Sequence, residues 1–104
     1  MDKTTINNVI LFFKQSLNAT GLKDNSIALF GSALTGNMHK DSDIDMIIIS
    51  KSFEGKDIFE RTKMTLQPEK DTIHKFKIPM DILTMSPAEY EYSQTAFFKS
   101  KIVA

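Results

Sequence analysis

The stretch Ser26-Ile27-Ala28-Leu29-Phe30, which leads into Gly31-Ser32, and the stretch Asp43-Ile44-Asp45-Met46-Ile47-Ile48-Ile49-Ser50 decide the fold of this chain. Each holds a short apolar run bounded by polar or turn-forming residues, which is the pattern of a buried strand. Met46 to Ile49 are all apolar, so we expect both faces of the second strand to be covered. The sequence therefore predicts strands over 26–30 and 43–50, joined by a turn over 32–36 with room for one helical turn.

Helix signals lie on either side of these strands. Before them, apolar residues at three- and four-residue steps predict an amphipathic helix over 5–18, which Gly21 ends. After them, a second helix is expected over 55–66; Pro68 ends it, and a loop over 69–77 follows. The apolar residues assigned to the core are Ile6, Val9, Ile10, Phe13 and Leu17 in the first helix and Ile58, Phe59, Met64 and Leu66 in the second.

The C-terminal part predicts one more strand and one more helix. The strand covers 78–84 and has Pro79 at its beginning, where a missing backbone donor is tolerated. Ser86-Pro87-Ala88-Glu89 is a capping box with proline at the first helical position, so a last helix begins there. The core contacts expected from this helix are Tyr90, Phe97, Phe98 and Ile102.

Strands that alternate with helices predict an α/β (α+β) fold, in which helices flank a small mixed sheet of three to four strands. With 104 residues, the chain is expected to form a single domain over 1–104. Its content of 41% apolar and 25% charged residues is that of a globular protein and excludes a disordered or fibrous one.

Charge and cysteine content narrow the classes of function. Thirteen basic and thirteen acidic residues balance, which gives no electrostatic reason to expect broad binding to nucleic acids or membrane surfaces. The absence of cysteine excludes disulfides and thiolate metal sites. The apolar run Val9–Phe13 near the N-terminus is too short for a signal peptide or a membrane span. We therefore expect a cytoplasmic protein without a membrane partner, and a homo-oligomer stays open.

Asp43 and Asp45 are the first candidate site residues. Residues two apart on a strand point to the same face, so these carboxylates are expected to lie side by side and to repel each other. A divalent cation would compensate this repulsion, and oxygen ligands without histidine or cysteine suit Mg²⁺ or Mn²⁺ better than zinc. An Asp-x-Asp pair alone is more often a solvated pair at the mouth of a strand, so the metal hypothesis depends on two further features.

Asp81 and the Gly31-Ser32 pair are these features. If the third strand lies beside the second, Asp81 joins Asp43 and Asp45 in a cluster of three carboxylates. A glycine directly after a strand lets a ligand approach the backbone, and the N–H groups of the following turn and a serine hydroxyl suit phosphate oxygens. Each feature is common by itself. The combination G-S-x10-D-x-D, followed by an aspartate in the next strand, is specific.

With these motifs in place, Leu29 to Gly36 and Asp41 to Ile48 resemble the nucleotidyltransferase motif of the DNA polymerase beta superfamily. Within it, the short chain resembles the minimal nucleotidyltransferases often encoded beside a HEPN-domain partner. The resemblance implies that Gly31 and Ser32 hold the β- and γ-phosphates of a nucleoside triphosphate. It implies further that Asp43 and Asp45 bind Mg²⁺ or Mn²⁺. Asp81 would complete the metal site and activate the attacking hydroxyl.

Two departures from this family pattern stand out. Many relatives have arginines between the serine and the second glycine, whereas this chain has Ala33, Leu34 and Thr35, so phosphate charge would be balanced by the metals, the backbone and His39 or Lys40. Relatives often end in a further short strand after the last helix. No such strand is expected before Ala104, so the edge strand is either missing or supplied by a partner.

Three readings of function follow. The first is an enzyme that transfers AMP from ATP to a hydroxyl, either a tyrosine of a HEPN toxin, which would make the protein an antitoxin, or a small molecule such as an antibiotic. The second is a binding module that neutralises its partner by complex formation alone. The third is an α/β domain with incidental aspartates. Outside the motif, we interpret His39, His74 and the lysines as solvated residues, with acceptor contact as the alternative for Lys70, Lys75 and Lys77.

Overall fold

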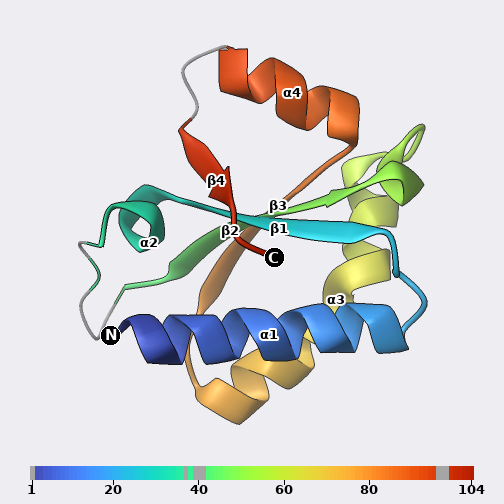
Figure 1. Ribbon diagram of the computed structural model, residues 1–104. Coiled ribbons are helices and arrows are strands. Elements are labelled where there is room, and N and C mark those ends of the chain that lie inside the picture. The colour runs from blue at the N-terminus through green and yellow to red at the C-terminus, as the bar shows by residue number, and fades with distance from the viewer. Residues whose placement is uncertain (1, 37, 39–41, 96–98) are drawn as a thin grey trace.

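The computed structural model describes residues 2–36, 38, 42–95 and 99–104 (Figure 1). In chain order the elements are α1 (Lys3–Ala19), β1 (Asn25–Phe30), α2 (Gly31–Thr35), β2 (Ile44–Ser50), the 3₁₀ turn η1 (Lys51–Phe53), α3 (Ile58–Phe76), β3 (Met80–Met85), α4 (Pro87–Thr95) and β4 (Ser100–Ile102). No helix within these ranges is long and apolar enough to cross a membrane.

The four strands form one mixed sheet in the order β3-β2-β1-β4. β1 is antiparallel to both β2 and β4, whereas β2 and β3 are parallel and are connected through α3. A parallel pair needs such a long crossover, because a tight turn can join only antiparallel neighbours. The predicted fold class, a small mixed sheet flanked by helices, is confirmed.

Helices cover the two faces of the sheet unequally. α1 and α3 lie on one face and α4 on the other (Figure 1). The larger core contains Ile44, Met46 and Ile48 of β2 together with the buried side of α1, while Ile47 and Ile49 form a smaller core that Tyr90 of α4 contacts. This alternation along β2 explains its uninterrupted apolar run, because both faces of the strand are buried. The residues of α1 predicted for the core are all buried, namely Ile6, Val9, Ile10, Phe13 and Leu17.

The second helix differs from its prediction, because α3 continues through Pro68 and includes most of the predicted loop. Its N-terminus is fixed by a capping box in which the Asp57 side chain accepts from the Glu60 backbone N–H at 2.9 Å. Pro68 lacks the N–H that a helix interior needs, but its ring is fully buried, and the Thr72 hydroxyl donates to its carbonyl at 2.7 Å. Burial and this hydrogen bond offset the local cost. Lys70 and Lys75 are therefore helical, and Lys77 is the C-cap.

The side of α3 that faces the core was also wrongly predicted. Ile58 and Phe59 are 70% and 76% exposed, and Leu66 is 42% exposed. Of the four apolar residues assigned to the core, Met64 alone packs against it. The buried positions of the helix are instead Thr65, Pro68 and Thr72.

The last two elements correct the expected C-terminus. α4 begins at Pro87 as predicted, and Glu89 and Ser86 form the capping box. The edge strand expected to be missing is present in the chain itself, because β4 pairs with β1 and places Ile102 opposite Ala28. Ile102 is therefore an edge-strand residue, 50% exposed, and not the predicted core contact. Phe97 and Phe98 lie outside the described residues.

Candidate functional site

The sheet brings Asp45 and Asp81 together. In the parallel pairing of β2 and β3, Asp45 and Asp81 are direct register partners. Partners in adjacent parallel strands point to the same face, and their backbones lie about 4.8 Å apart. Asp43 directly precedes β2 and is exposed. The conditional prediction that the third strand lies beside the second is thus confirmed.

The aspartates lie at the open end of the sheet face that α4 covers. Asp45 alternates with Ile44 and Met46, which belong to the larger core, and therefore points to the opposite face together with Ile47. Along this face, α4 packs over the far end of β2 through Tyr90. The side chain of Asp45 is half-buried and that of Asp81 is exposed, so a ligand can reach both carboxylates from solvent.

Gly31 lies against the Asp45 carboxylate. It has φ +60°, a conformation that side chains with a Cβ rarely adopt. A Cβ on Gly31 would collide with Asp45 Oδ2 and would lie 3.2 Å from Cγ. Glycine is required here for two reasons, the backbone conformation and the space that the carboxylate occupies. The first turn of α2 and the two aspartates therefore form one continuous surface.

The short helix α2 orients the backbone at this surface. Phe30, its N-cap, makes no capping hydrogen bond with its side chain, and Gly36 ends the helix in the left-handed conformation. The first backbone N–H groups of a helix have no partner within the helix, so such a turn is suited to an anion. Ser32 lies in this turn and is half-buried.

Electrostatics at the aspartates favour a cation. Burial raises the pKa of Asp45, and the negative charges of Asp81 and Asp43 raise it further. The ionised form of Asp45 is thus disfavoured by both burial and the two neighbouring negative charges. A divalent cation would remove this repulsion and hold the aspartates ionised.

The donor chemistry of the three carboxylates fits Mg²⁺ or Mn²⁺, hard cations that prefer oxygen ligands. Within the described part of the chain, however, no three acidic or histidine side chains lie in a group that could hold a metal ion, so the predicted cluster of three carboxylates is not formed there. The metal site and the roles assigned to Gly31, Ser32, Asp43, Asp45 and Asp81 therefore stay predictions. His39 and Lys40, proposed to balance phosphate charge, lie outside the described residues.

His74, like Lys70 and Lys77, lines a separate hollow near Pro79 and Met80 at the C-terminal end of α3. Among the described residues, no side chain of this hollow belongs to the predicted site. The side chain of His74 is exposed, which agrees with its interpretation as a solvated residue.

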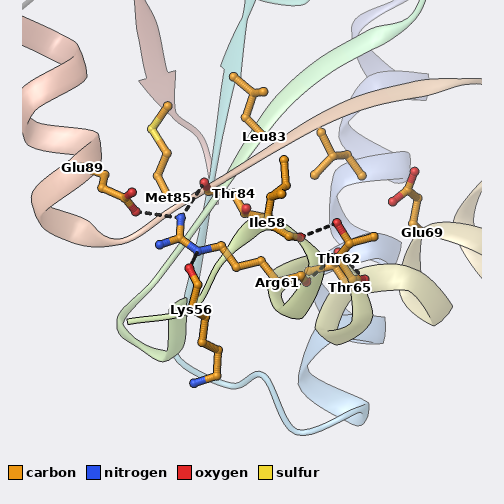
Figure 2. A pocket seen from close by; sticks show the side chains of 11 residues that line it. Lys56, Ile58, Arg61, Thr62, Thr65, Glu69, Leu83, Thr84, Met85 and Glu89 are labelled. Atoms are coloured by element: carbon orange, nitrogen blue, oxygen red, sulfur yellow. Dashed lines mark hydrogen bonds and ion pairs between the residues drawn. The ribbon is translucent and has the colours of Figure 1, made fainter. Parts of the chain in front are cut away.

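Sequence reasoning missed Arg61, the only arginine of the chain. Its side chain is 12% exposed and donates to the backbone carbonyls of Lys56 at 2.9 Å and Thr84 at 3.2 Å and to Glu89 Oε1 at 2.8 Å (Figure 2). Arg61 thereby joins α3 to β3, the strand of Asp81, and to α4. The signal in the sequence was its uniqueness, because arginine serves buried multidentate contacts better than lysine.

Comparison with known proteins agrees with this fold. Solved structures share it, among them the following two. A proposed nucleotidyltransferase from Sulfolobus solfataricus is 17% identical with a TM-score of 0.63, over 98% of this chain and 87% of its own. A second proposed nucleotidyltransferase is 22% identical with a TM-score of 0.54, over 95% of this chain and 97% of its own. No curated protein matches significantly. The model of the nucleotidyltransferase domain family matches residues 7–103, and the chain therefore belongs to this family.

Proposed function

We propose that this protein is a minimal nucleotidyltransferase that uses Mg²⁺ or Mn²⁺ to transfer AMP from ATP to a hydroxyl group. The observation that carries the proposal is the pairing of Asp45 with Asp81 directly beside Gly31. Two carboxylates beside a glycine turn support the proposal, because carboxylate oxygens suit hard cations and such a turn suits phosphate. Membership of the nucleotidyltransferase domain family supports the same chemistry.

Each predicted site residue has a physical task in this reaction. Asp43 and Asp45 would hold the cation, and the N–H groups and hydroxyl of Gly31 and Ser32 would bind the β- and γ-phosphates. A bound divalent cation supplies stabilisation of the charge that develops on the phosphate oxygens during an in-line displacement. Asp81 would accept the proton of the attacking hydroxyl. The acceptor oxygen then bonds to the α-phosphorus, and pyrophosphate leaves.

The acceptor we propose is a tyrosine of a HEPN-domain toxin, which makes the protein an antitoxin that acts in the cytoplasm. The test incubates the protein with Mg²⁺ and α-labelled ATP, alone and with the product of the gene adjacent to its own. The control is Asp45→Asn. Transfer of label to the neighbour protein by the parent and not by the variant is the expected result. Absence of transfer with Mg²⁺ and with Mn²⁺ would reject catalysis on this acceptor.

One observation favours the second reading, a binding module. Ala33 and Leu34 of α2 pack against the larger core, so this helix lacks the cations that many relatives use to hold phosphate. If the neighbour protein binds the parent and Asp45→Asn equally well and neither transfers label, neutralisation by complex formation replaces the proposal. We favour catalysis, because a pure binding module has no physical reason to keep three mutually repelling carboxylates.

A further inference from the structure

A groove of about 360 Å³ runs between α3 and the outer side of β3. We call it the α3–β3 groove. It is lined by residues 82–85 of β3, by Ile58, Arg61, Thr62, Thr65 and Glu69 of α3, and by Lys56 and Glu89 (Figure 2). None of these residues belongs to the predicted nucleotide site. The volume lies at the low end of ligand pockets, so it admits a long side chain with a short piece of main chain and no large ligand.

The wall that β3 contributes is the edge of the sheet. β3 is the terminal strand of the order β3-β2-β1-β4. The Pro79 carbonyl accepts from the Ile44 N–H of β2, so residues 79, 81 and 83 direct their backbone polar groups to β2. Ile82 and Thr84 consequently direct theirs into the groove. Among the described residues, no strand pairs with this edge, which is the arrangement that accepts an added strand.

At one end of this edge the backbone already has a hydrogen-bond partner. The Thr84 carbonyl accepts a hydrogen bond from Arg61, and Arg61 also donates to Glu89 (Figure 2). This leaves the Ile82 N–H and carbonyl and the Thr84 N–H for an added segment. A segment docked here can therefore pair over only two or three residues, which excludes a long sheet extension.

Glu69 supplies the charge at the other end of the groove. Burial alone raises the pKa of its carboxyl, and no hydrogen bond or ion pair of Glu69 occurs within the described ranges. Neither of the two cationic side chains that line the groove neutralises the Glu69 carboxylate. Arg61 forms its ion pair with Glu89, and Lys56 points away from Glu69 (Figure 2). A half-buried carboxylate without a partner is costly, and an incoming cation would relieve this cost.

From these observations we propose that the α3–β3 groove binds an extended segment of a partner protein, which pairs with the edge of β3 at Ile82 and places a lysine or arginine against Glu69. The main-chain hydrogen bonds give binding without sequence preference, and the charge of Glu69 selects the basic side chain. Ile58 and Leu83, both exposed at the rim, contact the apolar stem of that side chain and its neighbours. This docking surface does not depend on nucleotidyl transfer.

The test titrates the protein with the peptide acetyl-Thr-Val-Lys-Val-Thr-amide and follows the backbone amides by NMR. Expected are shifts that concentrate at Ile82 and Thr84. Replacement of the peptide lysine by norleucine, which keeps the stem and removes the charge, should weaken binding about tenfold. Glu69→Gln in the protein should have the same effect. Glu91→Gln, an exposed glutamate of α4 outside the groove, is the matched control and should bind like the parent.

Three results would overturn the proposal. The first is the absence of shifts at Ile82 up to about 10 mM peptide, which is weaker than even fragment-like binding. The second is equal binding of the lysine and norleucine peptides, which would remove Glu69 from recognition. The third is a shift of the Ile82 amide that depends on protein concentration without any peptide. This last result would make a second copy of the chain the occupant.

Discussion

The carboxylate of Asp45 occupies the space in which any other residue at position 31 would have its Cβ. Gly31 directly follows β1 as the first residue of α2, with φ +60°, and Asp45 reaches it from the antiparallel neighbour β2, so each residue limits the position of the other. This contact couples the turn assigned to phosphate with the carboxylates assigned to metal. Replacement of Gly31 therefore has two costs, the strain of a positive φ and the collision of an added Cβ with Asp45, and a matched control can separate them.

Gly31→Ala should reduce both stability and ligand binding. A Cβ in the left-handed region costs about 1–2 kcal/mol, and the collision with Asp45 adds to this cost and displaces the carboxylate. Gly55→Ala is the matched control, because Gly55 has φ +73° and nothing lies within 4 Å of its added Cβ. Thermal unfolding should show a larger loss for Gly31→Ala, and calorimetry with Mn²⁺ and ATP should show binding by Gly55→Ala alone. Equal behaviour of the two variants would contradict the contact.

Asp45→Asn should stabilise the metal-free protein at neutral pH. The folded pKa of Asp45 is raised above its usual 3.8 by burial and by Asp81 and Asp43, so the ionised form opposes folding. Stability is thus lost as pH rises from 3.8 through the folded pKa, and asparagine removes this loss. Mg²⁺ should raise the melting temperature of the parent and not of the variant. A variant that melts lower without metal would show that the carboxylate is not under repulsion.

Arg61 and Glu89 should contribute unequally although they form one ion pair. Arg61→Met leaves the Thr84 and Lys56 carbonyls without their donor and should cost about 2–3 kcal/mol. Glu89→Gln keeps the capping box with Ser86 and removes only a half-exposed charge, so about 0.5–1 kcal/mol is expected. Urea unfolding of the two variants compares these costs. Similar losses would mean that the ion pair with Glu89 of α4, and not the contacts to the two carbonyls, accounts for the contribution of Arg61 to stability.

Glu69→Gln should stabilise the protein in a pH-dependent manner. Burial raises the folded pKa above the usual 4.5, so the free energy of unfolding of the parent falls as pH rises from 4.5 through the folded pKa and then levels off. The variant lacks this titration. Melting curves should coincide well below pH 4.5 and separate above it, with the variant melting higher at pH 7. A variant that melts lower at pH 7 would reveal a favourable partner of the Glu69 carboxylate.

The sheet centre and the pairing of Asp45 with Asp81 could be predicted from the sequence. The apolar run of β2 required two covered faces, and α1 shows an unambiguous helical stripe. Asp45 and Asp81 each follow the first residue of their strand, so parallel pairing alone was enough to bring them together. Local pattern and tertiary structure agree in these segments, and the prediction therefore held.

The course of α3 and the presence of β4 could not be predicted. A proline normally ends a helix. Pro68 is tolerated inside α3 because its ring is buried and its carbonyl accepts a hydrogen bond from the Thr72 hydroxyl. The buried side of α3 holds Thr65 and Thr72 while Ile58 is exposed, so its hydrophobic pattern was misleading. β4 has three residues, too few to carry a strand pattern, and forms because the edge of β1 is available. In each case a tertiary contact outweighs the local signal.

The contact between Gly31 and Asp45 had no sequence signal beyond the glycine itself. The spacing of the motif residues along the chain predicts the order in which they occur. The distance between Gly31 and the Asp45 carboxylate depends instead on how β1 pairs with β2. The same holds for Arg61, whose three acceptors come from separate segments of the chain.

The central claim is that the carboxylates and the Gly31 turn bind one metal–nucleotide complex. The most direct test adds Mn²⁺ with a non-hydrolysable ATP analogue and maps paramagnetic broadening of the backbone amides by NMR. We predict strong broadening at Gly31, Ser32, Asp45 and Asp81, absent in Asp45→Asn and in a magnesium control. Broadening centred elsewhere, or unchanged in Asp45→Asn, would contradict the assignment of this site and the function built on it.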